Sequence, residues 1–300
     1  MTKGIKILVT CDLHQWIPKW KELVKAAARE KPRFVLIAGD LLPKSGGYDA
    51  QKRFFAEMGR HFRQIMQNGP ITILTYLGND DLHILEPALG QLETKGLCVK
   101  LNGRVHREAG LVFCGMNKVR DYPFGYKHWC VPDGKYVACP EQFCGEGLTL
   151  DERGEFVPLE NLVQYLSAKP SIKQELDRLK EQLEEGEMRR SIWMIHQPPS
   201  DVGMDICRNG QRAGSPTVLK FAADNQPLFG CSGHIHESPY QAGGNWVAHV
   251  GRTVWVQPGQ VDFQLHYVTL EITEALGINS VRHSIFGVEA ETRPPQPSNR

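Results

Sequence analysis

The chain has 300 residues, of which 41% are hydrophobic and 23% are charged, an ordinary composition for a globular protein with one large core or two smaller ones. Its 35 Lys and Arg residues nearly balance its 34 Asp and Glu residues, so the formal charge is only +1. This balance excludes an overall basic field that would hold a long nucleic acid by counterion release, and it leaves only a local basic patch open.

The beginning of the chain favours a soluble, cytoplasmic protein. Its first apolar run is far too short for a secretory signal and continues directly into a strand pattern. No window comes near the roughly eighteen uninterrupted apolar residues of a membrane span. Without a secretory signal, the eight cysteines indicate reduced thiols and not a disulfide framework.

Strands and helices alternate through the first third of the chain. Apolar runs of strand length are separated by amphipathic segments whose apolar residues recur at helical spacing. In chain order we predict a strand at 5–10, a helix at 17–30, a strand at 33–39, a helix at 50–67 and a strand at 71–77. Because these strands are almost continuously apolar, they indicate a sheet that is covered on both faces. Residues 96–116 then change to short strands with Asn-Gly and Ala-Gly turns, which predicts β-hairpin structure.

The regular pattern breaks from about residue 117 to residue 190. The first part of this segment is rich in Gly, Pro, aromatic residues and Cys, and the second part contains one or two charged helices interrupted by Pro170. We interpret the segment as an insertion that caps or flanks a site, within a single α/β domain that spans residues 1–292. The last residues, 293–300, have the composition of a disordered tail.

Regular elements return after the insertion. Strands are predicted at 191–196, 227–236, 246–259 and 263–273. Ser215 and Pro216 mark the start of a helix between the first two of these strands, as the N-cap and the first helical residue.

Polar side chains follow five of the apolar runs, at the point where each strand ends. They are Asp12 and His14, Asp40, Asn79, His196, and His234 and His236. Because ligands collect outside the carboxyl ends of strands in open α/β sheets, we expect all of these side chains in one cleft. Their oxygen and imidazole donors suit Mn²⁺, Zn²⁺ or iron. Seven donors exceed the need of one ion with open positions, which favours two ions about 3.5–4 Å apart with a shared carboxylate.

In this order, the motifs Asp-x-His, Gly-Asp, Gly-Asn, a lone His and Gly-His-x-His resemble those of the calcineurin-like metallophosphoesterase superfamily. The resemblance covers roughly residues 5–260 apart from the insertion. Each residue taken singly is more often a structural side chain or part of a turn, so the ordered set carries the inference. The resemblance implies an α/β fold built as a four-layered α/β/β/α sandwich.

The resemblance also implies two divalent metal ions, with Mn²⁺ as the first choice and Zn²⁺, iron or Ni²⁺ as alternatives. The implied ligands are Asp12, His14 and His236 for the first ion, Asn79, His196 and His234 for the second, and Asp40 as the bridge between them. The implied catalytic set is Asp40, Asn79, Asp80, Asp81 and His196.

The activity implied is hydrolysis of a phosphoester by in-line attack of a metal-bridging hydroxide, with phosphomonoesterase and phosphodiesterase activity both open. We expect a small phosphoester substrate, without membrane or nucleic-acid partners, and the oligomeric state is not predicted. One alternative is a nuclease, which shares the metal site but needs a basic groove that the composition does not suggest. Another is a non-catalytic scaffold or binding protein on this fold, and the intact ligand positions argue against it.

One position departs from the family pattern. The residue after Gly-Asn is commonly a His thought to assist the leaving oxygen, but here it is Asp80, while Asp81 keeps the position of the Asp that orients this His. An ionised Asp80 would repel a departing oxyanion, and we expect nearby metal ions to keep it ionised. The chain should therefore cleave good leaving groups, of aryl or phosphoanhydride type, far better than alkyl alcohols. His83 is the nearest imidazole and a weak substitute.

Two further groups of residues have competing interpretations. One group could bind a structural Zn²⁺ but lacks the paired C-x-x-C spacing, so unpaired thiols are favoured. It consists of His128, Cys130, Cys139 and Cys144. The other is Arg120 with Asp121, which could reach the cleft from a loop or form a surface ion pair.

Overall fold

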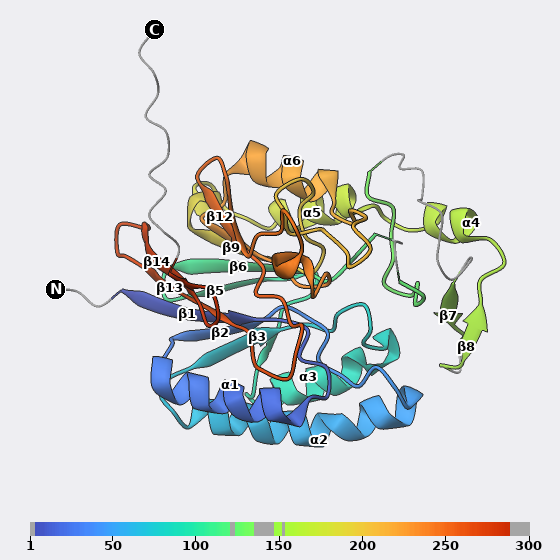
Figure 1. Ribbon diagram of the computed structural model, residues 1–300, viewed down its shortest axis with the longest axis horizontal. Coiled ribbons are helices and arrows are strands. Elements are labelled where there is room, and N and C mark those ends of the chain that lie inside the picture. Colours follow the sequence, from blue (N-terminus) through green and yellow to red (C-terminus); the bar gives the residue numbers. More distant parts are fainter. Residues whose placement is uncertain (1–3, 121–123, 135–146, 152–153, 289–300) are drawn as a thin grey trace, which may run out of the picture.

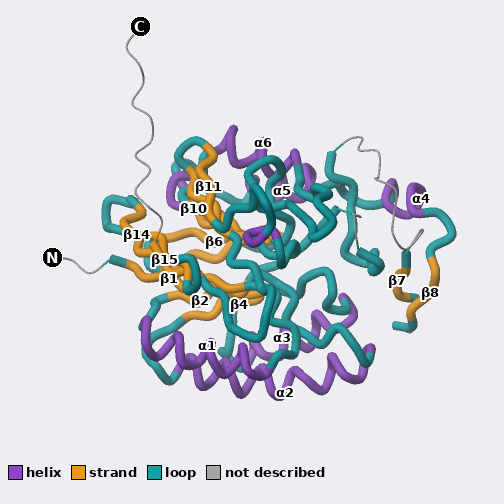
Figure 2. Tube along the Cα trace, in the orientation of Figure 1, coloured by secondary structure: helices purple, strands orange, loops and turns teal. Residues whose placement is uncertain are grey.

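The computed structural model describes residues 4–120, 124–134, 147–151 and 154–288 of the chain. Within them, two large β-sheets pack face to face, and helices cover the outer face of each sheet (Figure 1). Figure 2 shows the same layers by type, with the orange strands between two outer sets of purple helices. This architecture is the four-layered α/β/β/α sandwich that the sequence predicts.

The first sheet supplies the strands that begin and end the described chain. Its strands are β1 (Ile5–Thr10), β2 (Phe34–Ile37), β3 (Thr72–Thr75), β4 (Val99–Lys100), β13 (Val268–Ile272), β14 (Ile278–His283) and β15 (Gly287–Val288). They lie in the order β15-β14-β13-β1-β2-β3-β4. β1 to β4 run parallel, whereas β13 pairs antiparallel with β1. The carboxyl ends of β1, β2 and β3 therefore meet at one edge of the sandwich.

Three helices connect the parallel strands and cover this sheet from outside (Figure 1). They are α1 (Ile17–Glu30), α2 (Gly47–Met66) and α3 (Glu86–Thr94), with the short 3₁₀ turn η1 (His83–Leu85) before α3. The predicted strand and helix order of the first third of the chain is thus confirmed.

The second sheet is built from the middle of the chain. Its strands are β5 (Val105–Glu108), β6 (Leu111–Met116), β9 (Ser191–Ile195), β10 (Phe229–Cys231), β11 (Val247–Val250) and β12 (Thr253–Val256). They lie in the order β11-β12-β10-β9-β6-β5, with the central four strands parallel. β5 and β6 form the predicted hairpin, whose turn places Ala109 and Gly110 at positive φ.

Side-chain alternation along the strands separates the core into layers. On β1, Leu8 packs under the helices, while its neighbours Ile7 and Val9 pack between the two sheets. All three are fully buried. The opposite face of the second sheet carries Trp193, which packs against Phe221 of α6 (Pro216–Asn225). Both faces of both sheets are apolar, which explains the near-continuous apolar runs in the sequence.

The predicted insertion lies between β6 and β9, which are hydrogen-bonded neighbours in the second sheet. It contains β7 (Leu148–Leu150), β8 (Phe156–Pro158), α4 (Leu162–Ser167), α5 (Ile172–Lys180) and the 3₁₀ turn η2 (Glu187–Arg190). β7 and β8 pair only with each other, in a small sheet of their own.

The insertion is not uniform, because α5 belongs to the outer layer of the sandwich. Its residues Ile172, Leu176 and Leu179 are buried against the second sheet together with α6. Within the described part of the chain, every helix is too short or too polar to span a lipid bilayer. The predicted tail at 293–300 lies outside the described residues.

Candidate metal centre

Loops that follow five strands bring the seven predicted ligands together at one edge of the sandwich. Asp12 and His14 follow β1, Asp40 follows β2, Asn79 follows β3, His196 follows β9, and His234 and His236 follow β10. The first sheet thus supplies four of these side chains and the second sheet supplies three. Six of them are buried, and the His236 side chain is 22% exposed.

Four of these residues adopt left-handed backbone conformations although none of them is glycine. The φ values are 52° for Asp12, 45° for His14, 54° for Asp40 and 75° for His234. Such conformations cost roughly 1–3 kcal/mol each and persist where the surroundings fix them. Here the Asp12 and His14 amides donate to the carbonyls of Gly39 and Asp40, at 3.0 and 2.8 Å. Four of the nine non-glycine residues with positive φ in the described chain are thus candidate ligands.

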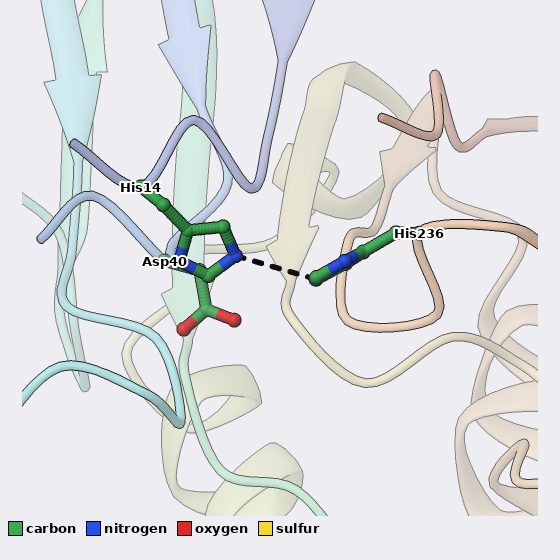
Figure 3. A group of neighbouring side chains, drawn as sticks. All are labelled: His14, Asp40 and His236. Atoms are coloured by element: carbon green, nitrogen blue, oxygen red, sulfur yellow. Dashed lines mark hydrogen bonds between the residues drawn. The ribbon is translucent and has the colours of Figure 1, made fainter. Parts of the chain in front are cut away.

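One group of donors consists of His14, Asp40 and His236, whose ligand atoms lie within 4.8 Å of one another. Figure 3 shows the two imidazoles directed toward each other with the Asp40 carboxylate beside the His14 ring, and the two Nε2 atoms lie 3.4 Å apart. Asp12 lies beside this group, because its Oδ1 is 3.7 Å from His236 Nε2. The arrangement offers two imidazole nitrogens and two carboxylates to one cation.

A second group forms around Asn79, with imidazoles from the other sheet. Asn79 Oδ1 lies 2.9 Å from His196 Nε2 and 2.6 Å from His234 Nδ1. His196 Nδ1 donates to the Ala38 carbonyl at 2.7 Å, which fixes the ring with Nε2 directed at the side-chain oxygens of Asn79 and Asp40. The ring of Phe124, from the insertion, packs on His234 with 4.1 Å between centroids. The insertion therefore flanks this side of the centre.

Asp40 belongs to both sets of donors. It groups with His14 and His236 and, separately, with Asp12 and His196. Its Oδ1 accepts a hydrogen bond from the Asp80 amide at 2.9 Å, whereas Oδ2 has only the His196 Nε2 contact at 3.4 Å, and Asp12 Oδ2 is buried without a hydrogen-bond partner among the described residues. An unsatisfied buried acceptor costs about 1–3 kcal/mol, and a cation would satisfy both of these oxygens. The donor set and its orphaned oxygens fit a pair of divalent ions.

The electrostatics of the centre favour a charged Asp40. Burial alone would raise the pKa of this carboxyl, but the positive charges of His196 and Lys44 outweigh it and hold the pKa well below its usual range. Burial would lower the pKa of His196, but the Asp40 carboxylate outweighs burial and raises it. Burial raises the pKa of Asp12, because this carboxyl has weaker compensation. A bound cation would add to the stabilisation of both carboxylates.

Asp81 fastens two of the ligand loops together. Its carboxylate accepts hydrogen bonds from the amides of Leu41, Leu42 and Gly78, at 2.9, 2.7 and 2.8 Å. The loop after β2 is thereby tied to the loop after β3, which holds Asp40 beside Asn79. The contacts of Asp81 make it a positioning residue.

Asp80 faces a cation that the sequence motifs do not mark. Its Oδ2 pairs with Lys44 Nζ at 2.9 Å, and its Oδ1 accepts from Asn79 Nδ2 at 2.9 Å. The second bond orients the Asn79 amide so that its oxygen points at the imidazoles. Burial and the Asp40 charge raise the pKa of Asp80, and Lys44 opposes them. Lys44 lies in the loop after β2, four residues beyond Asp40, and this proximity is the signal that could have identified it.

His83 and His128 contact each other. His83 packs against the rings of His128 and Trp129, with centroids 5.5 and 6.0 Å apart. His128 Nε2 donates to the Asp81 carbonyl at 3.1 Å, and the Cys130 thiol lies 3.4 Å from the Arg120 carbonyl.

Cys139, Cys144 and Asp121 lie outside the described residues, so the zinc and ion-pair interpretations stay untested. The Arg120 guanidinium donates to the Gly214 carbonyl.

A cavity of about 320 Å³ adjoins the first group of donors. Its lining combines ligands, cations, acids and two exposed rings. The lining residues are Asp12, His14, Trp16, Lys19, Lys44, Arg208, His236, Glu237, Gln260, Val261, Asp262 and Phe263.

Comparison with known proteins gives one family and a set of similar folds. The family model described as calcineurin-like phosphoesterase matches residues 5–238. One solved structure is 15% identical, with a TM-score of 0.58 over 94% of this chain and 98% of its own. The protein TT1561 of Thermus thermophilus is 16% identical, with a TM-score of 0.54 over 93% of this chain and 98% of its own. At these identities the two structures support the fold alone. No curated protein sequence matches the chain.

Proposed function

Because the chain belongs to the calcineurin-like phosphoesterase family, we propose that it is a metal-dependent hydrolase that cleaves phosphoester bonds of small substrates. The observation that carries the proposal is the position of Asp40, whose carboxylate belongs to two groups of metal-type donors at once. A shared carboxylate is what a two-ion centre requires, and such centres suit in-line displacement at phosphorus.

The residues assigned to the centre are the seven that meet at the edge of the sandwich. Asp12, His14 and His236 would hold one ion, Asn79, His196 and His234 the other, and Asp40 both. Bound there, divalent ions would lower the pKa of water and neutralise phosphoryl charge, which favours hydrolysis. Mn²⁺ is the first choice, and Zn²⁺, iron and Ni²⁺ suit the same donors.

The remaining groups act by orienting these donors. The bond from His196 Nδ1 to the Ala38 carbonyl fixes the ring with Nε2 directed inward, where a bound ion would take the place of the Nε2 proton. The bond from Asn79 Nδ2 to Asp80 keeps the amide oxygen directed inward in the same way. Each loop thus presents a lone pair to the centre without having to rotate a side chain.

The pair formed by Asp80 and Lys44 bears on the leaving group. An ionised Asp80 alone would repel a departing oxyanion, but the Lys44 ammonium at 2.9 Å offsets that charge and lines the substrate cavity. Burial would lower the pKa of Lys44, but Asp80 and Asp40 outweigh it and raise the pKa, so the ammonium is a hydrogen-bond donor and a poor acid. We therefore keep the expectation that good leaving groups, of aryl or phosphoanhydride type, are cleaved far better than alkyl alcohols.

The proposal is tested with a panel of substrates and metals. Protein loaded with Mn²⁺, Zn²⁺, Ni²⁺ or Mg²⁺ is assayed on aryl phosphate monoesters and diesters, cyclic nucleotides, nucleoside di- and triphosphates, and a single-stranded oligonucleotide. We expect metal-dependent turnover of a small phosphoester. Asp40→Asn should abolish it, while Asp224→Asn, a matched change at an exposed ion pair on α6, should not.

Two outcomes would contradict the proposal. If elemental analysis finds two ions per chain and no substrate is turned over, the scaffold alternative is favoured. If only the oligonucleotide is cleaved, the nuclease alternative is favoured.

A further inference from the structure

The cavity beside the first donor group has an aromatic rim. Trp16 is 43% exposed and Phe263 is 70% exposed, which are high values for such large apolar rings. Their centroids lie 5.0 Å apart with the planes at 71°, so the edge of one ring meets the face of the other. Two exposed rings that touch at the mouth of a polar cavity leave open faces toward a ligand.

Helix α1 and one hydrogen-bonded loop carry the two rings. Trp16 is the N-cap residue of α1, two positions after the candidate ligand His14, and Lys19 Nζ lies 6.0 Å from the Trp16 ring centroid. Phe263 lies in the loop between β12 and β13. Gln260 ties this loop to β1, because its Nε2 donates to Thr10 Oγ1 at 3.2 Å and to the His266 carbonyl at 2.7 Å. The rim is therefore built from two parts of the chain that are far apart in sequence.

The cavity has a polar inner end and an apolar mouth. Asp12, His14 and His236 form the inner end, and the lining also includes the cationic groups of Lys19, Lys44 and Arg208. A phosphoester bound with its phosphorus at the metal centre, and its phosphoryl oxygens near these cations, would direct one substituent along the cavity. The volume of about 320 Å³ is at the small end of the range for ligand pockets, so a substituent of modest size reaches the rim.

We propose that Trp16 and Phe263 form a ring-binding subsite that selects phosphoesters whose organic group carries a planar aromatic ring. The inference rests on the proposed hydrolase function, because it requires the phosphate at the metal centre. The shared chemistry is a flat π face, which either a nucleobase or a simple aryl group provides. Stacking of a base on a protein ring changes affinity by about 5- to 150-fold.

Two pairs of substrates test the subsite, because the members of each pair differ in the ring. All four have alkyl leaving alcohols, which we expect to be cleaved slowly, so only the ratio of kcat/KM within each pair is compared. One pair is AMP and ribose 5-phosphate, which differ in the nucleobase. The other is benzyl phosphate and cyclohexylmethyl phosphate, which differ in aromaticity. If the substrate panel shows a preference for diesters, the methyl esters of the same four compounds replace them.

We expect the wild type to favour the aromatic member of at least one pair by about tenfold or more in kcat/KM. The pair that shows the preference identifies the ring as nucleobase or aryl. Trp16→Ala and Phe263→Ala should each bring the ratio close to one. Trp16→Leu keeps apolar bulk without the aromatic face and should do the same. Phe286→Ala is the matched control, because Phe286 is 44% exposed and does not line the cavity, and it should leave the ratio unchanged.

Calorimetric binding of AMP and ribose 5-phosphate to Mn²⁺-loaded protein gives a second measurement that does not depend on turnover. If AMP binds more tightly than ribose 5-phosphate and the Trp16 variants abolish the difference, the subsite is supported. This holds even if no substrate of the panel is hydrolysed, and such a lack of hydrolysis would overturn only the proposed function. Equal kcat/KM within both pairs and equal binding in wild type and variants would refute the subsite and leave the hydrolase standing.

Discussion

Replacing Gly78 by alanine should disturb the metal centre without removing any ligand. Gly78 precedes Asn79 in the loop after β3 and packs against Asp40. A Cβ built on Gly78 falls 2.8 Å from Asp40 Cγ, and closer still to the Asp40 backbone nitrogen and Oδ1. The φ of Gly78 is not in the left-handed region, so alanine can adopt its conformation and the clash is the whole perturbation. Because backbone atoms are involved, rotation of a side chain cannot relieve it.

The size of the effect follows from the position of Asp40. Forcing an extra methyl group into a packed site costs about 1–3 kcal/mol. Asp40 is the donor that both groups share, so any shift that relieves the clash moves a ligand of both ions. If the clash weakens ion binding, the affinity for the ions falls by about 5- to 150-fold. If the clash instead destabilises the fold, the free energy of unfolding of the ion-free protein falls by about 1–3 kcal/mol.

The two possibilities are separated by titrating Mn²⁺ into the protein by calorimetry and by measuring unfolding with and without ions. Gly90→Ala in α3 is the control, because a Cβ there meets nothing within 4 Å, and alanine favours a helix over glycine by up to about 1 kcal/mol. We expect Gly90→Ala to bind ions normally and to be as stable as the wild type or more so. If Gly78→Ala matches the wild type in ion affinity, unfolding free energy and turnover, the packing of Asp40 does not set the geometry of the centre.

Four further substitutions each change a single side chain. Asp40→Asn should lose at least one bound ion per chain, measured by elemental analysis, and should lose turnover. A variant that keeps two ions and wild-type turnover would contradict the role of Asp40 as a ligand shared by both ions. Lys44→Ala removes a charged hydrogen-bond donor, so it should lower kcat/KM on substituted phenyl phosphoesters by about tenfold or more and steepen the dependence of kcat/KM on leaving-group pKa. Asp80→His should flatten that dependence. A flat wild-type dependence would mean that another residue supplies the proton. Hydrogen bonds from Arg107 lower the pKa of Glu187 from 4.5 to about 2, so the stability that this carboxylate contributes is complete above pH 4.5 and is lost as the pH falls toward 2. The difference in unfolding free energy between wild type and Glu187→Gln, measured by urea denaturation, should therefore shrink across that window, and a pH-independent difference would count against it.

The seven candidate ligands could be predicted to meet because each follows a strand whose apolar pattern is unambiguous. Asp40, for example, comes directly after a run that only a buried strand explains, and parallel strands end at a common edge. The backbone conformation of Asp12 or Asp40 could not be predicted, because non-glycine residues rarely adopt positive φ and only the surrounding hydrogen bonds enforce it.

Contacts between distant segments were also beyond prediction. Nothing in the sequence pairs Trp16 with Phe263, because the loop that carries Phe263 is positioned by tertiary hydrogen bonds. The packing of α5 on the second sheet could have been predicted from the sequence. Ile172, Leu176 and Leu179 recur at helical spacing and mark a face that packs on the second sheet, but the many charges around them favoured an exposed insertion.

The division of the donors between the two sheets has a mechanical consequence. Asp12, Asp40 and Asn79 extend from the first sheet, and His196 and His234 extend from the second. Between the sheets themselves the contact is apolar and non-directional, and it resists separation better than it resists sliding. Ions held by both sets of donors would cross-link the halves of the sandwich at one edge, with a direction and a fixed length. Sliding of one sheet over the other would then change the distances between the two sets of donors, so the alignment of the sheets and the geometry of the centre would depend on the same bonds.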